Sequence, residues 1–162
     1  MSVTLDILRS YRRPREVMRR QLAGGERDDR ALVYLIIACA LIFVAQLPLL
    51  AREAYFHPEV PLEARMGGAL LGWMAIAPLM FYVLAAVSHL LARVFGGRGS
   101  WFSARLALFW ALLATTPLWL LQGLVAGLIG AGMALNLVGG LLAGIFLFIW
   151  GSGLFVAEKR DA

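Results

Sequence analysis

The sequence has few of the residues from which catalytic and metal sites are usually built. It contains one cysteine, Cys39, and two histidines, His57 and His89. A single cysteine excludes an intramolecular disulfide and a cysteine-based metal site, and no third histidine or cysteine is present to complete another kind of metal centre. We therefore predict no catalytic residue, no metal site and no cofactor.

Charged residues are also scarce. They make up 15% of the 162 residues, against 61% hydrophobic residues, and the mean hydropathy of +0.78 exceeds what a water-facing surface tolerates. Four apolar runs are each about as long as the 20 residues that cross a bilayer as a helix: residues 31 to 50, 68 to 92, 104 to 128 and 134 to 156. Backbone groups in lipid must be satisfied within the segment. The sequence thus predicts an all-α integral membrane protein with a four-helix transmembrane bundle.

None of these runs carries Asp, Glu, Lys or Arg in its middle. Ionisable groups inside a bilayer are usually functional, so their absence argues against proton- or sodium-coupled transport and against intramembrane acid–base catalysis. His89 lies near one end of the second run and is interpreted as a hydrogen-bonded packing residue or interfacial anchor rather than a ligand. Its neighbour Ser88 points about 100° away on a helix, so the two do not form a nucleophile and base.

The basic residues are unevenly distributed. Thirteen of the fifteen arginines and lysines lie in the N-terminal segment, between residues 93 and 105, or in the tail, and only Arg52 and Arg65 fall between the first two runs. Short basic segments stay in the cytoplasm. We predict a transmembrane domain over residues 31 to 156 and a short cytoplasmic tail over residues 157 to 162. Both termini and the hairpin GGRGS are predicted to be cytoplasmic, and residues 51 to 66 and the turn GAGMA are predicted to lie outside. The excess of arginine over lysine, with many alanines and glycines, suggests a GC-rich bacterial genome and hence the inner membrane.

Residues 1 to 30 are predicted to form a cytoplasmic, basic, amphipathic segment. It divides into two short helices near Pro14 and ends at Gly24 and Gly25, and in the second helix Val17, Met18 and Leu22 form an apolar stripe. Such a segment usually lies in the headgroup layer, which is the interpretation we favour. The alternatives are a cap under the bundle and a docking site for a partner. We expect these arginines to contact anionic headgroups or a partner: Arg12, Arg13, Arg15, Arg19, Arg20, Arg98 and Arg105. Acidic residues interspersed among them disfavour nucleic-acid binding.

Glycine and proline mark the breaks in the apolar region. Gly96, Gly97, Gly99 and Ser100 allow a tight cytoplasmic hairpin, in which Ser100 or Ser103 caps the following helix; Asp28 and Asp29 are candidate caps for the first run. Pro78 and Pro117 lie inside runs and predict kinks, with a gating hinge as the alternative interpretation. The threonines at positions 115 and 116 have hydroxyls that can satisfy a carbonyl freed at the second kink.

The stretch GGRGSWFSARLALFWALLATTPLWLL, residues 96 to 121, resembles the Ypt-interacting protein (Yip) domain family of membrane proteins, and the similarity extends over roughly residues 10 to 156. The matching positions are Gly96, Gly97, Gly99, Ser100, Arg105, Phe109, Trp110 and Pro117. The resemblance implies a polytopic helical membrane protein of the prokaryotic branch without known catalytic residues. Eukaryotic relatives bind small GTPases in vesicle trafficking, but the 30-residue N-terminal segment and four rather than five spans argue against that role here.

The sequence supports three functional hypotheses. The first is a non-enzymatic protein that organises anionic lipid, membrane-protein partners or copies of itself through its bundle and basic cytoplasmic face. The second is an accessory subunit of a larger respiratory or photosynthetic membrane complex. The third is a small transporter or channel for an uncharged solute, with the two intramembrane prolines as hinges.

Overall fold

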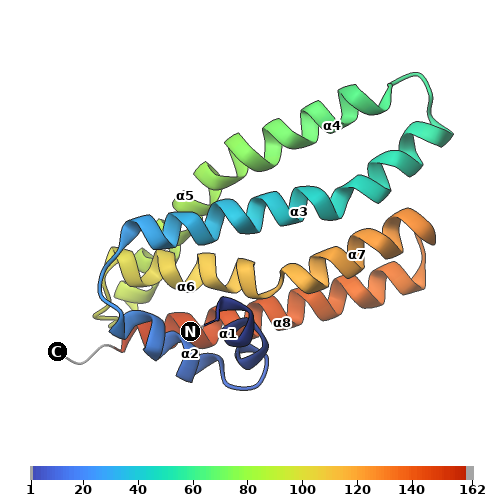
Figure 1. The fold of residues 1–162 in the computed structure, drawn as a ribbon. Helices are drawn as coiled ribbons and strands as arrows, with labels where there is room; N and C mark the ends of the chain where they lie inside the picture. The colour runs from blue at the N-terminus through green and yellow to red at the C-terminus, as the bar shows by residue number, and fades with distance from the viewer. Residues whose placement is uncertain (1, 160–162) are drawn as a thin grey trace.

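A computed structural model describes residues 2–159, and this part of the chain is helical without strands (Figure 1). The helices are α1 Val3–Ser10, α2 Pro14–Ala23, α3 Asp28–Phe56, α4 Leu62–Leu71, a π-helical segment Gly72–Ile76, α5 Ala77–Val94, α6 Trp101–Ala114, α7 Thr116–Leu128 and α8 Met133–Glu158. Residues 160–162 of the predicted tail lie outside the described range. Ala157 and Glu158, which were also assigned to that tail, belong to α8.

Three helices are long and apolar enough to cross a membrane: α3, the continuous helix Leu62–Val94, and α8. The fourth predicted run is present as α6 and α7, which meet at a bend of 45° and count as one more span only if the bent pair crosses as a unit. The all-helical, multi-pass membrane architecture is therefore confirmed, with three or four candidate spans. The second span begins earlier than predicted because a polar turn with Glu63 and Arg65 is already helical.

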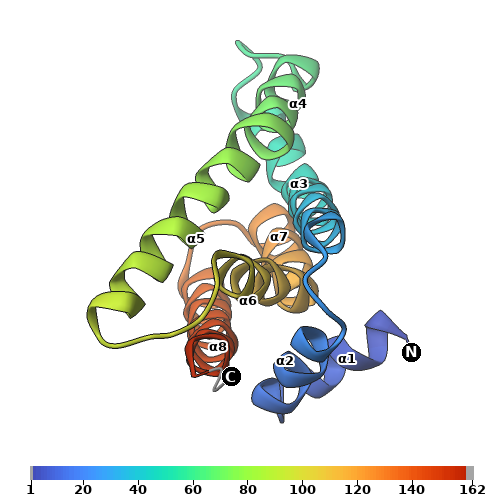
Figure 2. The ribbon, with the colours of Figure 1, turned by 90° about the vertical axis from the view of Figure 1, so that its left-hand side faces the viewer.

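Helix α6 lies at the centre of the molecule, with α3, α5 and α8 packed around it (Figure 2). Apart from Arg105, every residue from Phe102 to Ala114 is buried. Helices α3 and α7 approach most closely: a side chain at Gly123 would meet the backbone of Ala45, and one at Gly127 would meet Pro48. In contrast, α5 leans outward and exposes a row of large apolar side chains, as expected of a lipid-facing helix.

The two arginines at the opposite end from the hairpin take part in internal contacts. Arg52 donates to the carbonyls of Gly127 and Leu128 at the C-terminus of α7, at 3.2 and 3.5 Å, where the helix dipole favours a cation. Arg65 forms an ion pair with Glu53 at 3.0 Å and donates to backbone carbonyls of the connecting loop. Arg52 and Arg65, which are predicted to lie outside the cytoplasm, therefore both stabilise turns within the protein.

The break at Pro117 is satisfied by neighbouring hydroxyls, as predicted. Thr116 Oγ1 donates to the carbonyl of Leu113, the acceptor that Pro117 cannot reach, at 2.8 Å. Thr115 Oγ1 likewise donates to carbonyls of the preceding turn at 2.9 and 3.0 Å. At Pro78 the chain adjusts differently, since a π-helical segment precedes the proline and the helix continues to Val94 without a break.

The predicted helix caps are partly right. Ser100 Oγ accepts from the Ser103 N–H at 3.1 Å, and the Ser100 N–H donates to Ser103 Oγ at 3.0 Å, which makes a reciprocal capping box. For α3 the prediction is wrong, because Arg27 occupies the N-cap position and no side-chain cap forms. Asp28 and Asp29 instead lie in the first helical turn, where their charges meet the positive end of the helix dipole.

Candidate functional site

The N-terminal helix α1 is attached to the centre of the bundle through polar contacts. Trp110 Nε1–H of α6 donates to Ser10 Oγ at 3.0 Å, and Ser10 Oγ donates to the carbonyl of Asp6 at 2.8 Å. Tyr11, just after α1, donates its hydroxyl to the carbonyl of Ala114 at 2.7 Å, beside the break between α6 and α7. Burial raises the pKa of the Tyr11 phenol above its ordinary value of 10.0, which keeps this donor protonated.

The two N-terminal helices turn opposite kinds of side chain towards the bundle. In α2, Val17, Met18 and Leu22 are buried in the hydrophobic core, so the expectation that this stripe dips into the headgroup layer is wrong. In α1 the buried side chains are Asp6 and Ser10, whereas Val3, Leu5 and Leu8 are exposed. The exposed apolar surface of the segment therefore belongs to α1 rather than to α2.

Several of the predicted contact arginines form ion pairs within the protein. Arg20 pairs with Asp6 at 3.1 Å and with Glu16 at 3.5 Å, and Arg13 also reaches Glu16 at 3.5 Å. Arg105 pairs with Asp28 at 3.0 Å and so connects the start of α6 to the start of α3. These residues still contribute positive potential, but part of their charge is compensated locally.

The remaining arginines in α2 and just before it line grooves on the outer side of this helix. Arg12, Arg15 and Arg19 border a groove of about 480 Å³ that also touches Phe148 and Ser152 of α8, and the paired residues Arg13 and Glu16 line the same groove. None of the grooves around α1 and α2 includes Arg98 or Arg105 among the residues that line it. The structure thus brings Arg12, Arg15 and Arg19 together and leaves the hairpin arginines apart from them.

The predicted hairpin is held by the end of α8. His89 Nδ1 lies 2.8 Å from Glu158 Oε1, and because an ionised carboxylate only accepts hydrogen bonds, the imidazole N–H is the donor. The Gly99 N–H donates to Glu158 Oε2 at 3.0 Å, and the Arg98 N–H donates to the Glu158 carbonyl at 2.9 Å. His89 is 1% exposed and Glu158 is 8% exposed, and the His89 ring contacts that of Trp101 at a centroid distance of 4.6 Å.

The hairpin glycines are explained by this packing. A side chain at Gly99 would come within 2.5 Å of the Ala157 carbonyl oxygen, and one at Gly97 would come within 2.6 Å of a Glu158 carboxylate oxygen. Gly96 has a φ of +87°, which side chains other than glycine rarely adopt. The glycines therefore both reverse the chain and admit the C-terminus of α8.

Sequence reasoning missed Glu158 as a functional or structural residue. The interpretation of His89 as a hydrogen-bonded packing residue agrees with its buried contact, but no partner was predicted. A signal was present, since the predicted topology puts the ends of the second and fourth runs on the same membrane face. A lone histidine and a lone carboxylate at those two ends are candidates for pairing.

Within residues 2–159, no three His, Cys, Asp or Glu side chains lie close enough together to hold a metal ion. Comparison with curated proteins and with solved structures gives no match. The family model described as the Yip1 domain, however, matches residues 8–157, which include α2 to α8, the Gly-Ser hairpin and the Pro117 break. The chain therefore belongs to the Yip1 domain family of multi-pass membrane proteins.

Proposed function

We propose that this protein is a non-enzymatic inner-membrane protein that organises anionic lipids or membrane-protein partners through its basic cytoplasmic face. In this proposal α6 and α7 form one bent span, so that four spans cross the bilayer and both termini are cytoplasmic. The start of α3, the hairpin and the end of α8 lie at one end of the molecule (Figure 1), which supports a common face for them. The distribution of basic residues gives that face its cytoplasmic assignment.

The observation that carries the proposal is a difference among the arginines: some form ion pairs with carboxylates and others do not. Arg13, Arg20 and Arg105 are paired with carboxylates, whereas the ion pairs within residues 2–159 do not include Arg12, Arg15 or Arg19. These three arginines line a groove beside α8 together with the Arg13–Glu16 pair. Uncompensated arginines at a membrane face attract anionic headgroups, each by about 1 kcal/mol. Helix α2 has its apolar stripe buried, so it presents these charges from a fixed position rather than from a mobile peptide.

The proposal is tested by extracting the protein into native lipid nanodiscs and identifying every retained protein and lipid by mass spectrometry. We expect the protein alone, as a homo-oligomer or with a membrane-protein partner, and an enrichment of anionic lipid over the bulk membrane. A stoichiometric complex with respiratory or photosynthetic subunits would favour the accessory-subunit hypothesis instead. Recovery without a partner and with bulk lipid composition would refute the proposal.

A further inference from the structure

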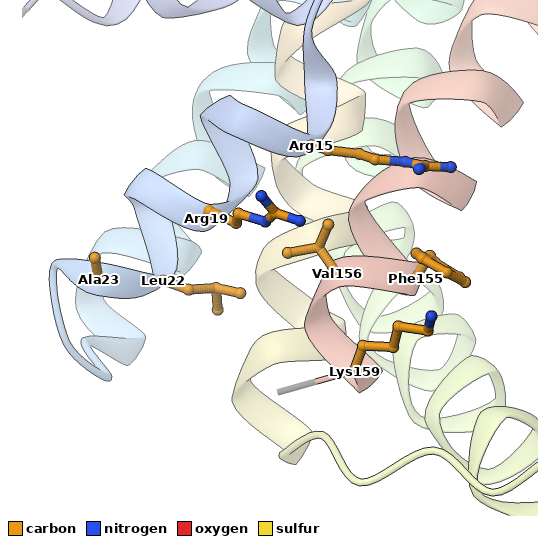
Figure 3. A pocket seen from close by; sticks show the side chains of 7 residues that line it. All are labelled: Arg15, Arg19, Leu22, Ala23, Phe155, Val156 and Lys159. Atoms are coloured by element: carbon orange, nitrogen blue, oxygen red, sulfur yellow. The ribbon is translucent and has the colours of Figure 1, made fainter. Parts of the chain in front are cut away.

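A second groove lies between the outer side of α2 and the last turns of α8 (Figure 3). It has a volume of about 460 Å³, and its walls come from Arg15, Arg19 and Leu22 of α2 and from Phe155 and Val156 of α8, with Lys159 directly after that helix. In Figure 3 Arg15 extends across the groove towards Phe155, and Lys159 turns towards the same ring from the other direction.

Three cations meet in this groove. The Arg15 guanidinium lies 5.0 Å from the Phe155 ring centre and the Lys159 ammonium 4.3 Å from it, both in cation–π contact. The ion pairs within residues 2–159 include neither of these cations nor Arg19. The positive charges of Arg15 and Lys159 around one ring repel each other, and Arg19 lines the same groove. An anion that reached all three cations would therefore be bound favourably.

The walls of the groove indicate an amphiphile rather than a soluble anion. Leu22, Phe155 and Val156 form an apolar side, and Phe155 remains 46% exposed. This groove adjoins the groove at Arg12, with which it shares Arg15 and Arg19. The groove at Arg12 is also lined by the Arg13–Glu16 ion pair, and it extends to Phe148. Phe148 lies two helical turns before Phe155 on the same face of α8, so an acyl chain can follow the two rings towards the middle of the membrane.

We propose that this groove is a binding site for a phospholipid whose headgroup carries two negative charges, either a phosphomonoester or a pair of phosphates. Arg15 and Arg19 donate to phosphate oxygens through planar guanidinium forks, and Lys159 adds a point charge. The acyl chain lies along Phe155 and Phe148. This inference rests on the proposed function and makes it specific, because it assigns the headgroup to one groove instead of to the whole basic face.

The test compares two variants that lose the same charge on the same predicted membrane face. Arg15→Gln/Arg19→Gln removes the groove arginines, and the control Arg27→Gln/Arg93→Gln removes two arginines that line none of the grooves beside α2. Each full-length protein is reconstituted in phosphatidylcholine nanodiscs containing either phosphatidic acid or phosphatidylglycerol, and lipid retained per protein is measured by native mass spectrometry. Glycerol phosphate is added in a parallel sample as a soluble competitor.

We expect the wild-type protein and the control to retain phosphatidic acid in preference to phosphatidylglycerol, and the groove variant to lose about thirtyfold in phosphatidic acid retention. Lys159→Gln, a single change at the end of α8, should lower it by about fivefold. Displacement by glycerol phosphate at equal concentration would overturn the assignment to a lipid.

The remaining outcomes separate this inference from the proposed function. Equal losses in the groove variant and the control would show that the whole basic face acts through its charge, which refutes the groove and leaves the organising role intact. No preference of the wild-type protein for either anionic lipid over phosphatidylcholine would refute both. Comparable far-ultraviolet circular dichroism of all variants is the criterion for including them.

Discussion

The contact between His89 and Glu158 gives the sharpest prediction for stability. The two side chains are almost fully buried, and Glu158 receives one hydrogen bond on each carboxylate oxygen, from His89 and from the Gly99 N–H. His89→Leu leaves one oxygen of a buried carboxylate without a donor. Leaving a buried polar group without its hydrogen-bond partner usually costs about 1–3 kcal/mol, and more for a charged group, so we expect about 3 kcal/mol here.

Two further variants separate the contribution of the His89–Glu158 contact to stability from the contributions of the individual side chains. In Glu158→Gln the amide oxygen can accept from Gly99 while its NH₂ group donates to the other tautomer of His89, so the loss should stay below about 1 kcal/mol. His89→Leu/Glu158→Leu removes both polar groups and should be less destabilised than His89→Leu alone.

The assay is equilibrium unfolding in mixed detergent micelles, followed by tryptophan fluorescence. Trp101 lies against His89 and reports on this end of the bundle. The coupling free energy from the double-mutant cycle should exceed about 1 kcal/mol. Additive effects, or a change below about 1 kcal/mol for His89→Leu, would refute the view that this contact fastens the hairpin to α8.

Three other predictions concern the rest of the bundle. Gly123→Ala should lower the free energy of unfolding by about 1–3 kcal/mol because the added methyl group meets the backbone of α3, whereas Gly144→Ala, with open space around it, should not. Because burial raises the pKa of Tyr11, its hydrogen bond contributes fully below about pH 10 and is lost as the pH rises through the raised value; Tyr11→Phe should abolish that part of the pH dependence of stability above about pH 10. Arg52→Gln should reduce the thermal stability by about 1 kcal/mol, since a charged donor is lost from the end of α7, and unchanged melting would contradict that assignment.

The membrane architecture could be predicted because the bilayer imposes strong constraints on composition and length. Long apolar runs have no stable alternative to helix in lipid, so the helical spans followed directly from the sequence. The break at Pro117 was also predictable, since a proline removes a specific hydrogen bond and the preceding threonines supply local donors. The π-helical segment Gly72–Ile76 was not, because its extra residue depends on how Trp73 and Met74 pack against the core.

Contacts between distant residues explain what the sequence did not reveal about the site. Amphipathicity showed that α2 has an apolar stripe, but lipid and protein are equally apolar partners, so periodicity could not decide between them. Trp110 and Tyr11 hold the segment against α6 through single hydrogen bonds that leave no pattern in the sequence. Glu158 differs from them, because the predicted topology places it on the same membrane face as His89, 69 positions away, but a shared face alone does not show that the two side chains touch.

The last turns of α8 carry both the contact with His89 and one wall of the proposed lipid-binding groove. Glu158 faces α5 and the hairpin, whereas Phe155 and Lys159 line the groove beside α2. A binding site is most precise when its side chains stand on a rigid element, and the contact between His89 and Glu158 fixes the element that carries Phe155. A lipid-binding defect in His89→Leu would therefore be an indirect effect of a displaced helix end. Only variants such as Arg15→Gln/Arg19→Gln, which leave that contact untouched, can assign the headgroup to the groove.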